Sequence, residues 1–462
     1  MAGPSILSSC SCEQLAEKSI CSSTTVEVLK SLGFTQLTKI QLKVLPHLLS
    51  KENCYIHART GSGKTLAFLV PTVERLRAMK FKDSHGVGAL VISPTRELAQ
   101  QTAQLVKPLA DAHGLSSLSL VGGNKDKAPL ERGAVIVVAT PGRLCKVLKP
   151  GKGTILKVKK LKVLILDEAD KLLDDGTHTD HLRKIYSHLP TEKLQKILVS
   201  ATVADDCLKL AKDVLQEEGE FMCISTEAKS LPTTEQVKQS YISVGASDRL
   251  SMLITVLKTL RKKKVIVFFN SCQSVKFHNQ VLAHFELPVL YSMGQEKQNQ
   301  RNTTYSKFWD LKRGILLTTG MAERGWDIPG VHWIIIYDPP HKPEDYIHRI
   351  GRTGRGDGEI GEALLFLRPE ENQFIDVLHN MKVKITELEF GGELKDIQNQ
   401  VTTLIDQDKS IQEKAKIAYK KFIRAYQCHS LKTVFSIESL NLTEVCKSFG
   451  FAKPPMYLGH LK

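Results

Sequence analysis

Short runs of apolar residues recur along the chain, and each run ends in polar or small residues. Runs of this kind fit strands that are buried on both faces, as in parallel sheets. Stretches that look helical separate them, and this alternation predicts an α/β fold with helices on both faces of each sheet. The runs are 89–93, 135–139, 163–166 and 197–199 in the first half and 265–269, 315–317, 333–336 and 363–366 in the second.

The series of runs breaks once, at polar residues 225–240, which include a proline and show no apolar period. We therefore predict two lobes with a linker between them. After about residue 385 the runs stop, and the residues that follow look helical and basic. The predicted domains are a first lobe at 1–228, a linker at 229–240, a second lobe at 241–385 and a helical, basic C-terminal extension at 386–462.

The composition indicates what kind of molecule the protein binds. The formal net charge of +15 indicates a polyanionic partner, with nucleic acid first and an acidic membrane surface second, although many basic proteins bind neither. The ten cysteines show no zinc-ligand spacing and are expected to be reduced thiols in an intracellular protein. No apolar run is long enough for a transmembrane helix, and the N-terminus does not resemble a signal peptide, so no membrane partner is expected.

The strongest local motif is Ala58–Thr65, which matches a phosphate-binding P-loop except that Ala stands in place of the first Gly. Gly61 and Gly63 allow backbone N–H groups to wrap phosphates, and the following helix N-terminus adds positive potential. Lys64 would reach the β- and γ-phosphates, and the Thr65 hydroxyl would ligate Mg²⁺. The alternative is a glycine-rich turn with a surface lysine.

A second motif, Val163–Asp170, places four apolar residues before two carboxylates. This pattern predicts a buried strand that delivers acids to the crevice where α/β sheets bind ligands. Asp167 would hold Mg²⁺, and Glu168 would orient or deprotonate an attacking water molecule. An acidic strand end alone has little specificity, but here it follows a P-loop by about 100 residues.

Asp167–Asp170 reads D-E-A-D, and a series of further motifs lies around it in order, over about 33–356. The ordered series resembles that of DEAD-box RNA helicases. The resemblance implies two tandem RecA-like parallel-sheet lobes, with ATP and Mg²⁺ as cofactors. It also implies an RNA-stimulated ATPase that couples hydrolysis to local unwinding of RNA duplexes.

By the same resemblance, the nucleotide site draws on both lobes. The Q-motif-like Phe34 and Gln41 would select adenine, and the motif VI pair Arg352 and Arg355 would act as arginine fingers on the γ-phosphate. The implied catalytic residues are Lys64, Asp167, Glu168, Arg352 and Arg355. The implied nucleotide contacts are Phe34, Gln41, Ala58, Thr60, Gly61, Ser62, Gly63, Lys64, Thr65 and Asp327, and the metal ligands are Thr65 and Asp167.

The remaining motifs resemble those that hold the RNA backbone or couple ATP hydrolysis to RNA strand separation. Arg96 and Arg143 suit this role, since a guanidinium can fork onto phosphates. The implied RNA contacts are Pro94, Thr95, Arg96, Gly122, Gly123, Thr140, Pro141, Gly142, Arg143, Asn270, Gln298, Arg301 and Thr319. The implied interlobe coupling residues are Asp170, Ser200, Ala201, Thr202 and His348.

The C-terminal segment resembles the tail of DEAD-box helicases that act in ribosome assembly. The matching stretches are Tyr419–Tyr426, His429–Lys432, Leu440–Leu442, Ser448–Phe451 and Pro454–Pro455. The resemblance implies pre-ribosomal RNA as the substrate, pre-ribosomal proteins as possible partners and a nucleolar location in the nucleus rather than the cytoplasm. We take a monomer as the default oligomeric state.

Three other functions stay open at this point. An ATP-dependent RNA clamp would have the same fold without significant unwinding, and Gly320, where the family usually has Asp, leaves room for it. A DNA helicase would share the two lobes, since charge does not separate the nucleic acids. A non-enzymatic scaffold is disfavoured by the intact set of Lys64, Glu168, Arg352 and Arg355.

Overall fold

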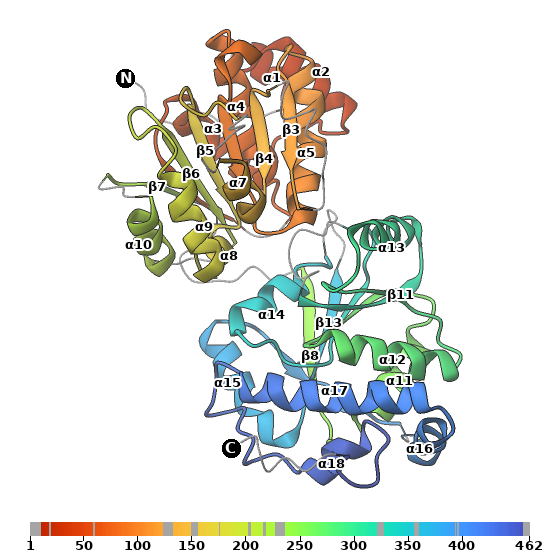
Figure 1. The fold of residues 1–462 in the computed structure, drawn as a ribbon. Helices are drawn as coiled ribbons and strands as arrows, with labels where there is room; N and C mark the ends of the chain where they lie inside the picture. Colours follow the sequence, from red (N-terminus) through yellow and green to blue (C-terminus); the bar gives the residue numbers. More distant parts are fainter. Residues whose placement is uncertain are drawn as a thin grey trace. The chain divides into compact units, whose positions relative to one another are not determined.

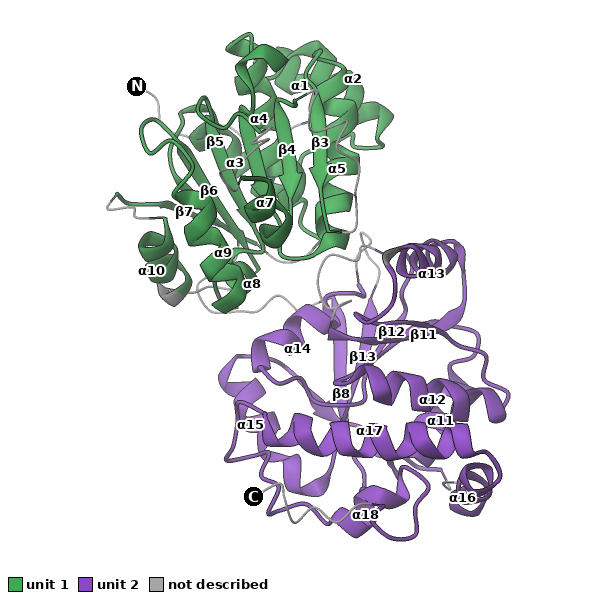
Figure 2. Ribbon diagram, viewed as in Figure 1, with its two compact units in different colours: residues 1–229 green, residues 230–462 purple. Residues whose placement is uncertain are grey.

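The computed structural model forms two compact units, 1–229 and 230–462 (Figure 2). No helix among the described residues is both long and apolar enough to cross a membrane. The described residues are 11–17, 20–58, 61–122, 133–148, 156–174, 176–201, 205–215, 219–226, 236–320, 328–354, 360–392, 394 and 397–455.

Unit 1 contains a seven-stranded sheet in the order β3-β4-β2-β5-β6-β1-β7, and all its neighbouring strands are parallel. Helices cover both faces (Figure 1). The strands are β1 Cys54–His57, β2 Ala89–Ile92, β3 Ser117–Leu120, β4 Ile136–Ala139, β5 Val163–Asp167, β6 Gln195–Ser200 and β7 Met222–Ser225. The helices are α1 Cys12–Glu17, α2 Ser23–Ser31, α3 Lys39–Leu49, α4 Lys64–Ala78, α5 Arg96–Asp111, α7 Pro141–Leu148, α8 Ala169–Asp174, α9 Gly176–Tyr186 and α10 Asp205–Val214.

The interior strands of unit 1 bury side chains on both faces because most of their positions are apolar. In β2, Ala89 and Val91 join one hydrophobic cluster, whereas Leu90 and Ile92 join the cluster on the other face. Successive side chains of a strand point to opposite faces, so one apolar run supplies both layers.

Unit 2 contains a second parallel sheet, in the order β10-β11-β9-β12-β13-β8-β14. The strands are β8 Val237–Ser243, β9 Lys264–Phe269, β10 Leu290–Ser292, β11 Gly314–Thr319, β12 Trp333–Ile336, β13 Gly361–Leu367 and β14 Thr386–Glu387. The helices are α11 Arg249–Thr259, α12 Cys272–His284, α13 Gln298–Asp310, α14 Pro343–Ile350, α15 Gln373–Asn380, α16 Gln398–Gln407, α17 Lys409–Gln427 and α18 Leu442–Lys447.

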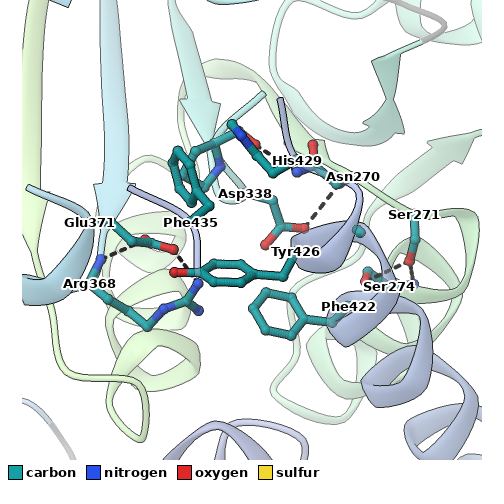
Figure 3. A pocket seen from close by; sticks show the side chains of 12 residues that line it. Asn270, Ser271, Ser274, Asp338, Arg368, Glu371, Phe422, Tyr426, His429 and Phe435 are labelled. Atoms are coloured by element: carbon teal, nitrogen blue, oxygen red, sulfur yellow. Dashed lines mark hydrogen bonds and ion pairs between the residues drawn. The ribbon is translucent and has the colours of Figure 1, made fainter. Parts of the chain in front are cut away.

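The C-terminal extension packs into unit 2 and shares its core. Helix α17 lies along α12 (Figure 1), and its apolar face joins the cluster that contains the strands of the sheet. Beside this contact, Arg368 pairs with Glu371, and its guanidinium lies 4.9 Å from the Phe422 ring and 5.1 Å from the Tyr426 ring, measured to the ring centroids (Figure 3). The extension, predicted as a separate domain from 386, is thus continuous with the core of the second lobe.

Each of the eight predicted apolar runs overlaps an observed strand. The predicted linker at 229–240 is too long at its C-terminal end, because β8 begins at Val237. This strand alternates buried with exposed or half-buried positions at its start, and its polar residues hid it in the sequence pattern. The units divide in sequence between Lys229 and Ser230.

Candidate active site

The P-loop of unit 1 joins β1 to α4. Gly61 and Gly63 have φ angles of 78° and 84°, a left-handed conformation that glycine adopts without steric cost. The Lys64 ammonium donates to the carbonyl of Ala58, so the loop closes on itself. Thr65 lies in the first turn of α4 with its side chain half-buried. The structure therefore places the glycines, the lysine and the hydroxyl at one helix N-terminus, whereas Thr60 lies outside the described residues.

Gln41 ties helix α3 to this loop. Its Nε2 donates to the Gly63 carbonyl at 3.0 Å, and its Oε1 accepts from the Thr38 backbone N–H at 2.8 Å. A Cβ on Gly63 would lie only 2.6 Å from Gln41 Nε2, so this approach requires glycine. Phe34 is exposed. Of the Q-motif-like residues, Gln41 thus lies beside the P-loop.

Asp167 and Glu168 stand at the carboxyl end of β5. Asp167 Oδ1 accepts from the Glu168 N–H at 3.1 Å, whereas Asp167 Oδ2 and Glu168 Oε2 are buried without a hydrogen-bond partner among the described residues. Burial, followed by the charge of Glu168, raises the pKa of Asp167 to about 7, and Lys64 opposes that shift. Carboxylate oxygens are ligands that Mg²⁺ prefers. Asp167 and Glu168 each have a buried oxygen without a hydrogen-bond partner among the described residues, and the positive charge nearby does not balance the two carboxylates. These residues therefore fit the metal.

Ser200 ends β6 next to the P-loop strand. It pairs in register with His57, and its carbonyl accepts from the Ala58 N–H at 3.3 Å. Ala201 follows directly, and Asp170 is half-buried in the first turn of α8. The structure therefore brings these coupling candidates to the same edge of the sheet as the P-loop. Thr202 lies outside the described residues.

The polymer-binding candidates of unit 1 follow the neighbouring strands β2, β3 and β4. Thr95 caps α5 and accepts from the Leu98 N–H at 3.3 Å, so Arg96 starts that helix after Pro94. A Cβ on Gly122 would lie 2.6 Å from an Arg96 guanidinium nitrogen, so the arginine lies against the glycine backbone. Thr140, Pro141, Gly142 and Arg143 lead from β4 into α7, and Gly123 lies outside the described residues.

The order of the strands separates the two groups of candidates. The nucleotide candidates follow β1, β5 and β6, which are neighbours, and the polymer candidates follow β3, β4 and β2, which are also neighbours. All these strands are parallel, so their carboxyl ends lie at one edge of the sheet. One edge can thus present both a phosphate site and a backbone-binding strip.

The candidates of unit 2 are arranged in the same way. Thr319 ends β11, Asn270 follows β9, and Arg301 lies in α13 after β10. His348 and Arg352 lie in and just after α14, which follows β12. These four strands are neighbours in the sheet. Asp327, Arg355 and the side chain of Gln298 lie outside what the structure describes.

Motif VI contains one buried arginine that the sequence did not single out. Arg352 Nε donates to the His348 carbonyl at 3.2 Å, and both side chains are buried. Arg349, the arginine between them, is equally buried and donates to the Asp338 carbonyl at 2.8 Å and to Asn270 Oδ1 at 3.1 Å. Its place in α14 could have indicated this burial, because Arg349 lies on the buried face of the helix, over the Phe268 ring of β9.

A second unexpected residue is His57, which stands in the strand before the P-loop. Its Nδ1 lies 3.0 Å from Ser225 Oγ, and the Lys43 ammonium donates to the Ser225 carbonyl at 3.0 Å. Ser225 ends β7, the last strand of unit 1. Helix α3, which carries Gln41, and strand β1, which leads into the P-loop, therefore both form hydrogen bonds to the end of β7.

Comparisons with known proteins agree with this arrangement. Residues 38–210 match the DEAD/DEAH box helicase family, 248–357 match the helicase conserved C-terminal domain, and 408–456 match the C-terminal extension of ATP-dependent rRNA helicase SPB4-like proteins. The yeast protein ATP-dependent RNA helicase HAS1, from Saccharomyces cerevisiae, is 40% identical over 448 residues, which are 96% of this chain and 88% of that protein. The chain belongs to the DEAD/DEAH box family of ATP-dependent RNA helicases.

Further relatives of this DEAD-box helicase extend the likeness. Human ATP-dependent RNA helicase DDX18 is 42% identical over 435 residues, which are 93% of this chain and 64% of the human protein. A solved structure of Mss116p (NTE and C-tail double deletion) bound to ssRNA and AMP-PNP is 28% identical. It has a TM-score of 0.84, and the match covers 97% of this chain and 92% of that one.

These findings confirm the predicted family, the two tandem RecA-like lobes with a helical C-terminal region, and the class of ATP-dependent RNA helicase. The roles of single residues stay predictions, as do the predicted domain limits apart from the end of the linker, where β8 begins at Val237. For Asn270, predicted to contact RNA, the structure adds hydrogen bonds inside unit 2 that engage its side-chain amide.

Proposed function

We propose that this DEAD-box helicase remodels pre-ribosomal RNA during ribosome assembly, using ATP hydrolysis to unwind short duplexes locally. The proposed substrate rests on the C-terminal extension, since residues 408–456 match the C-terminal extension of rRNA helicases. The relatives' names add ATP and RNA but no RNA target. Pre-ribosomal proteins are proposed partners, the nucleolus is the proposed location, and the working form is proposed to be a monomer.

ATP binding is proposed to rest on the residues gathered at the P-loop. Gln41 would read the adenine edge, Lys64 would exchange its bond to Ala58 for one to the phosphates, and Thr65 with Asp167 would hold Mg²⁺. When bound, Mg²⁺ would neutralise charge on the phosphates. A bound Mg²⁺ would supply the positive charge needed to keep Asp167 ionised.

Hydrolysis is proposed to use Glu168 as the residue that orients or deprotonates the attacking water. Its carboxylate follows directly on the metal ligand Asp167, and one of its oxygens has no hydrogen-bond partner among the described residues. Arg352 and Arg355 of unit 2 would stabilise charge on the transferred phosphoryl group, so turnover would need both lobes. Removal of such a finger costs roughly 10³–10⁵ in rate.

RNA binding is proposed to be largely independent of base sequence. The candidates at the edges of both sheets are guanidinium, hydroxyl and glycine backbone groups, which suit sugars and phosphates better than base edges. ATP and RNA together would favour a closed state because each binds it better than the open one.

The test is ATP hydrolysis with single-stranded RNA, with matched DNA and without polymer. We expect stimulation by RNA alone, abolished by Glu168→Gln while ATP still binds. Equal stimulation by DNA would contradict the RNA assignment, and turnover that survives the substitution would contradict the role of Glu168. Crosslinking in cells would then identify the RNA, and recovery of messenger RNA rather than pre-ribosomal RNA would contradict the proposed substrate.

The second candidate function is an ATP-dependent RNA clamp, which Gly320 favours because the family usually has Asp there. A clamp would hydrolyse ATP slowly and would hold RNA without separating strands. Displacement of one strand from a short duplex by the wild-type protein, with ATP, distinguishes the two: the helicase separates the strands and the clamp does not.

A further inference from the structure

Five consecutive backbone carbonyls, those of residues 337–341, each accept a hydrogen bond from a side chain elsewhere in unit 2. These residues connect strand β12 to helix α14. The donors, in the order of the carbonyls they reach, are Arg249, Arg349 (2.8 Å), Asn270 (2.6 Å), His429 (2.8 Å) and Ser430. We call this stretch the connecting segment. Two of its five donors belong to the C-terminal extension.

The sequence of the connecting segment explains why outside donors are needed. Pro339 and Pro340 have no backbone N–H and cannot form the regular bonds of a strand or helix. A buried carbonyl left without a donor costs about 1–3 kcal/mol. Side chains from other elements satisfy these carbonyls instead, and in doing so they fix the course of the chain.

His429 is built to donate rather than to accept at this contact. Its Nδ1 accepts from the Leu431 backbone N–H at 3.1 Å, which leaves the proton on Nε2 to face the Pro340 carbonyl. The ring stacks on Phe435 with 3.8 Å between centroids. Burial, then the neighbouring His341, lowers the pKa of His429 to about 4, so the ring is neutral near pH 7.

The connecting segment leads directly into the helix of motif VI. Arg349 of that helix bonds both the Asp338 carbonyl and Asn270 Oδ1, and the Asp338 carboxylate accepts from the Asn270 N–H at 3.0 Å (Figure 3). The last turn of α14, the connecting segment and the residue after β9 are therefore held by one network. A displacement of Pro340 would move α14, and with it Arg352 just beyond its last turn.

We propose that His429 and Ser430 are positioning residues for Arg352, so that the C-terminal extension sets the efficiency of hydrolysis from inside unit 2. The inference rests on the proposed function, in which Arg352 stabilises the γ-phosphate. Each acts through the carbonyl to which it donates, His429 through that of Pro340 and Ser430 through that of His341. The extension is thus a working part of the ATPase as well as a substrate-specific tail.

The test compares His429→Phe, which keeps a ring against Phe435 but loses the donor, with His429→Gln, which keeps an N–H donor. In the full chain with saturating RNA, His429→Phe is expected to lower kcat at least about tenfold, since misplacement of a catalytic group by about 1 Å can cost about 100-fold. The KM for ATP should stay within about twofold, because the P-loop contacts proposed to hold ATP lie in unit 1 and Arg352 is proposed to act on the transition state. His429→Gln should recover most of kcat, and Ser430→Ala should lower it in the same direction.

A matched control separates positioning from stability. Thr402→Val removes a side-chain bond of the same kind, from Thr402 Oγ1 to the Gly450 carbonyl at 3.1 Å, within the extension but away from the connecting segment. It should lower Tm as His429→Phe does and leave kcat unchanged. If His429→Phe and Ser430→Ala lower Tm alone, or if Thr402→Val lowers kcat equally, the inference is overturned.

Arg352→Ala distinguishes a failure of this inference from a failure of the proposed function. If this variant hydrolyses ATP at the wild-type rate, Arg352 does not act as an arginine finger, and the positioning role of His429 and Ser430 fails with it. If it abolishes turnover while His429→Phe does not change kcat, the proposed function stands and the positioning role alone fails.

Discussion

Glu168 adopts a left-handed backbone conformation, with φ at 50°, which is uncommon for a residue with a side chain. Strained positions of this kind gather at functional sites, where the surrounding structure enforces them. The sequence predicted the chemistry of this carboxylate from its place after a buried strand. It could not predict the turned backbone or the unpaired oxygens of Asp167 and Glu168, because both depend on packing between β5 and its neighbours.

Gln41→Ala is predicted to weaken ATP binding. The substitution removes the bond to the Gly63 carbonyl and the acceptor for the Thr38 N–H, and with them the link between α3 and the P-loop. Loss of one or two such bonds corresponds to about 1–2 kcal/mol, so the KM for ATP should rise roughly 5- to 30-fold. Steady-state hydrolysis with saturating RNA checks this, and an unchanged KM would contradict it.

His278 makes the stability of unit 2 depend on pH. Burial, opposed by its bond to the Ser274 carbonyl and aided by the charge of Arg249, lowers its pKa to about 4. Between pH 6.5 and 4 the unfolded chain binds a proton that the folded chain does not, so stability falls as the pH falls. At pH 5 this amounts to about 2 kcal/mol relative to pH 7.

His278→Phe is therefore predicted to make the free energy of unfolding less sensitive to acid. The ring lies among Phe269, Phe277 and Phe449, so an apolar ring fits its surroundings. Urea unfolding at pH 7 and pH 5 measures the effect. The fall in stability between the two values should be smaller in the variant than in the wild type, and an equal fall would refute the prediction.

At the scale of elements, most interior strands were predictable, whereas the interior strand β8 and the edge strands were not. Strand β12 runs over the same four residues as its predicted apolar run, because it is buried on both faces. Strands β3 and β10 lie at the sheet edges and carry half-exposed residues, so neither shows a continuous apolar run. The network around the connecting segment also escaped prediction, since its donors lie up to 181 residues apart in sequence, from Arg249 to Ser430.

Gly450→Ala is predicted to loosen the packing of the turn after α18 against α16. The residue has φ at 83°, and an added Cβ would lie 2.0 Å from Ile405 Cδ1 and 3.0 Å from Val401 Cγ1, both buried in α16. Left-handed strain and overpacking together should cost at least about 2 kcal/mol. Gly330→Ala is the control, because φ is 67° there and no atom lies within 4 Å of the added Cβ.

Urea unfolding of the two glycine variants measures the difference. Gly330→Ala should cost only about 1 kcal/mol, the left-handed strain alone. Equal losses of stability in the two variants would mean that the contact between α16 and the turn after α18 carries no energy.

At the scale of the whole molecule, the net charge of +15 is reflected in helix α17. This helix carries six basic residues and a single acid, Glu413, which pairs with Lys416. An extended basic helix of this kind attracts the phosphates of a polyanion. The basic residues are Lys409, Lys414, Lys416, Lys420, Lys421 and Arg424.

The double substitution Lys420→Ala with Arg424→Ala is predicted to weaken binding of long, structured RNA and to make it less sensitive to salt. Each lost phosphate contact should lower the slope of log K against log salt by about 0.7–0.9. The control is Lys184→Ala with Lys209→Ala, which changes the net charge equally on exposed helices of unit 1. Equal slopes in both pairs would mean that α17 attracts RNA only through the overall charge.

The connecting segment also bears on how the protein is made. Synthesis proceeds from the N-terminus, so Pro340 and His341 leave the ribosome almost ninety residues before His429 and Ser430, which bond them. Unit 1 has its own sheet and cores and can fold during translation, as N-terminal domains do. The carbonyls of Pro340 and His341 gain these donors only when the last part of the chain has emerged. If His429 and Ser430 position Arg352 as proposed, a nascent chain acquires its nucleotide pocket before it can position this arginine.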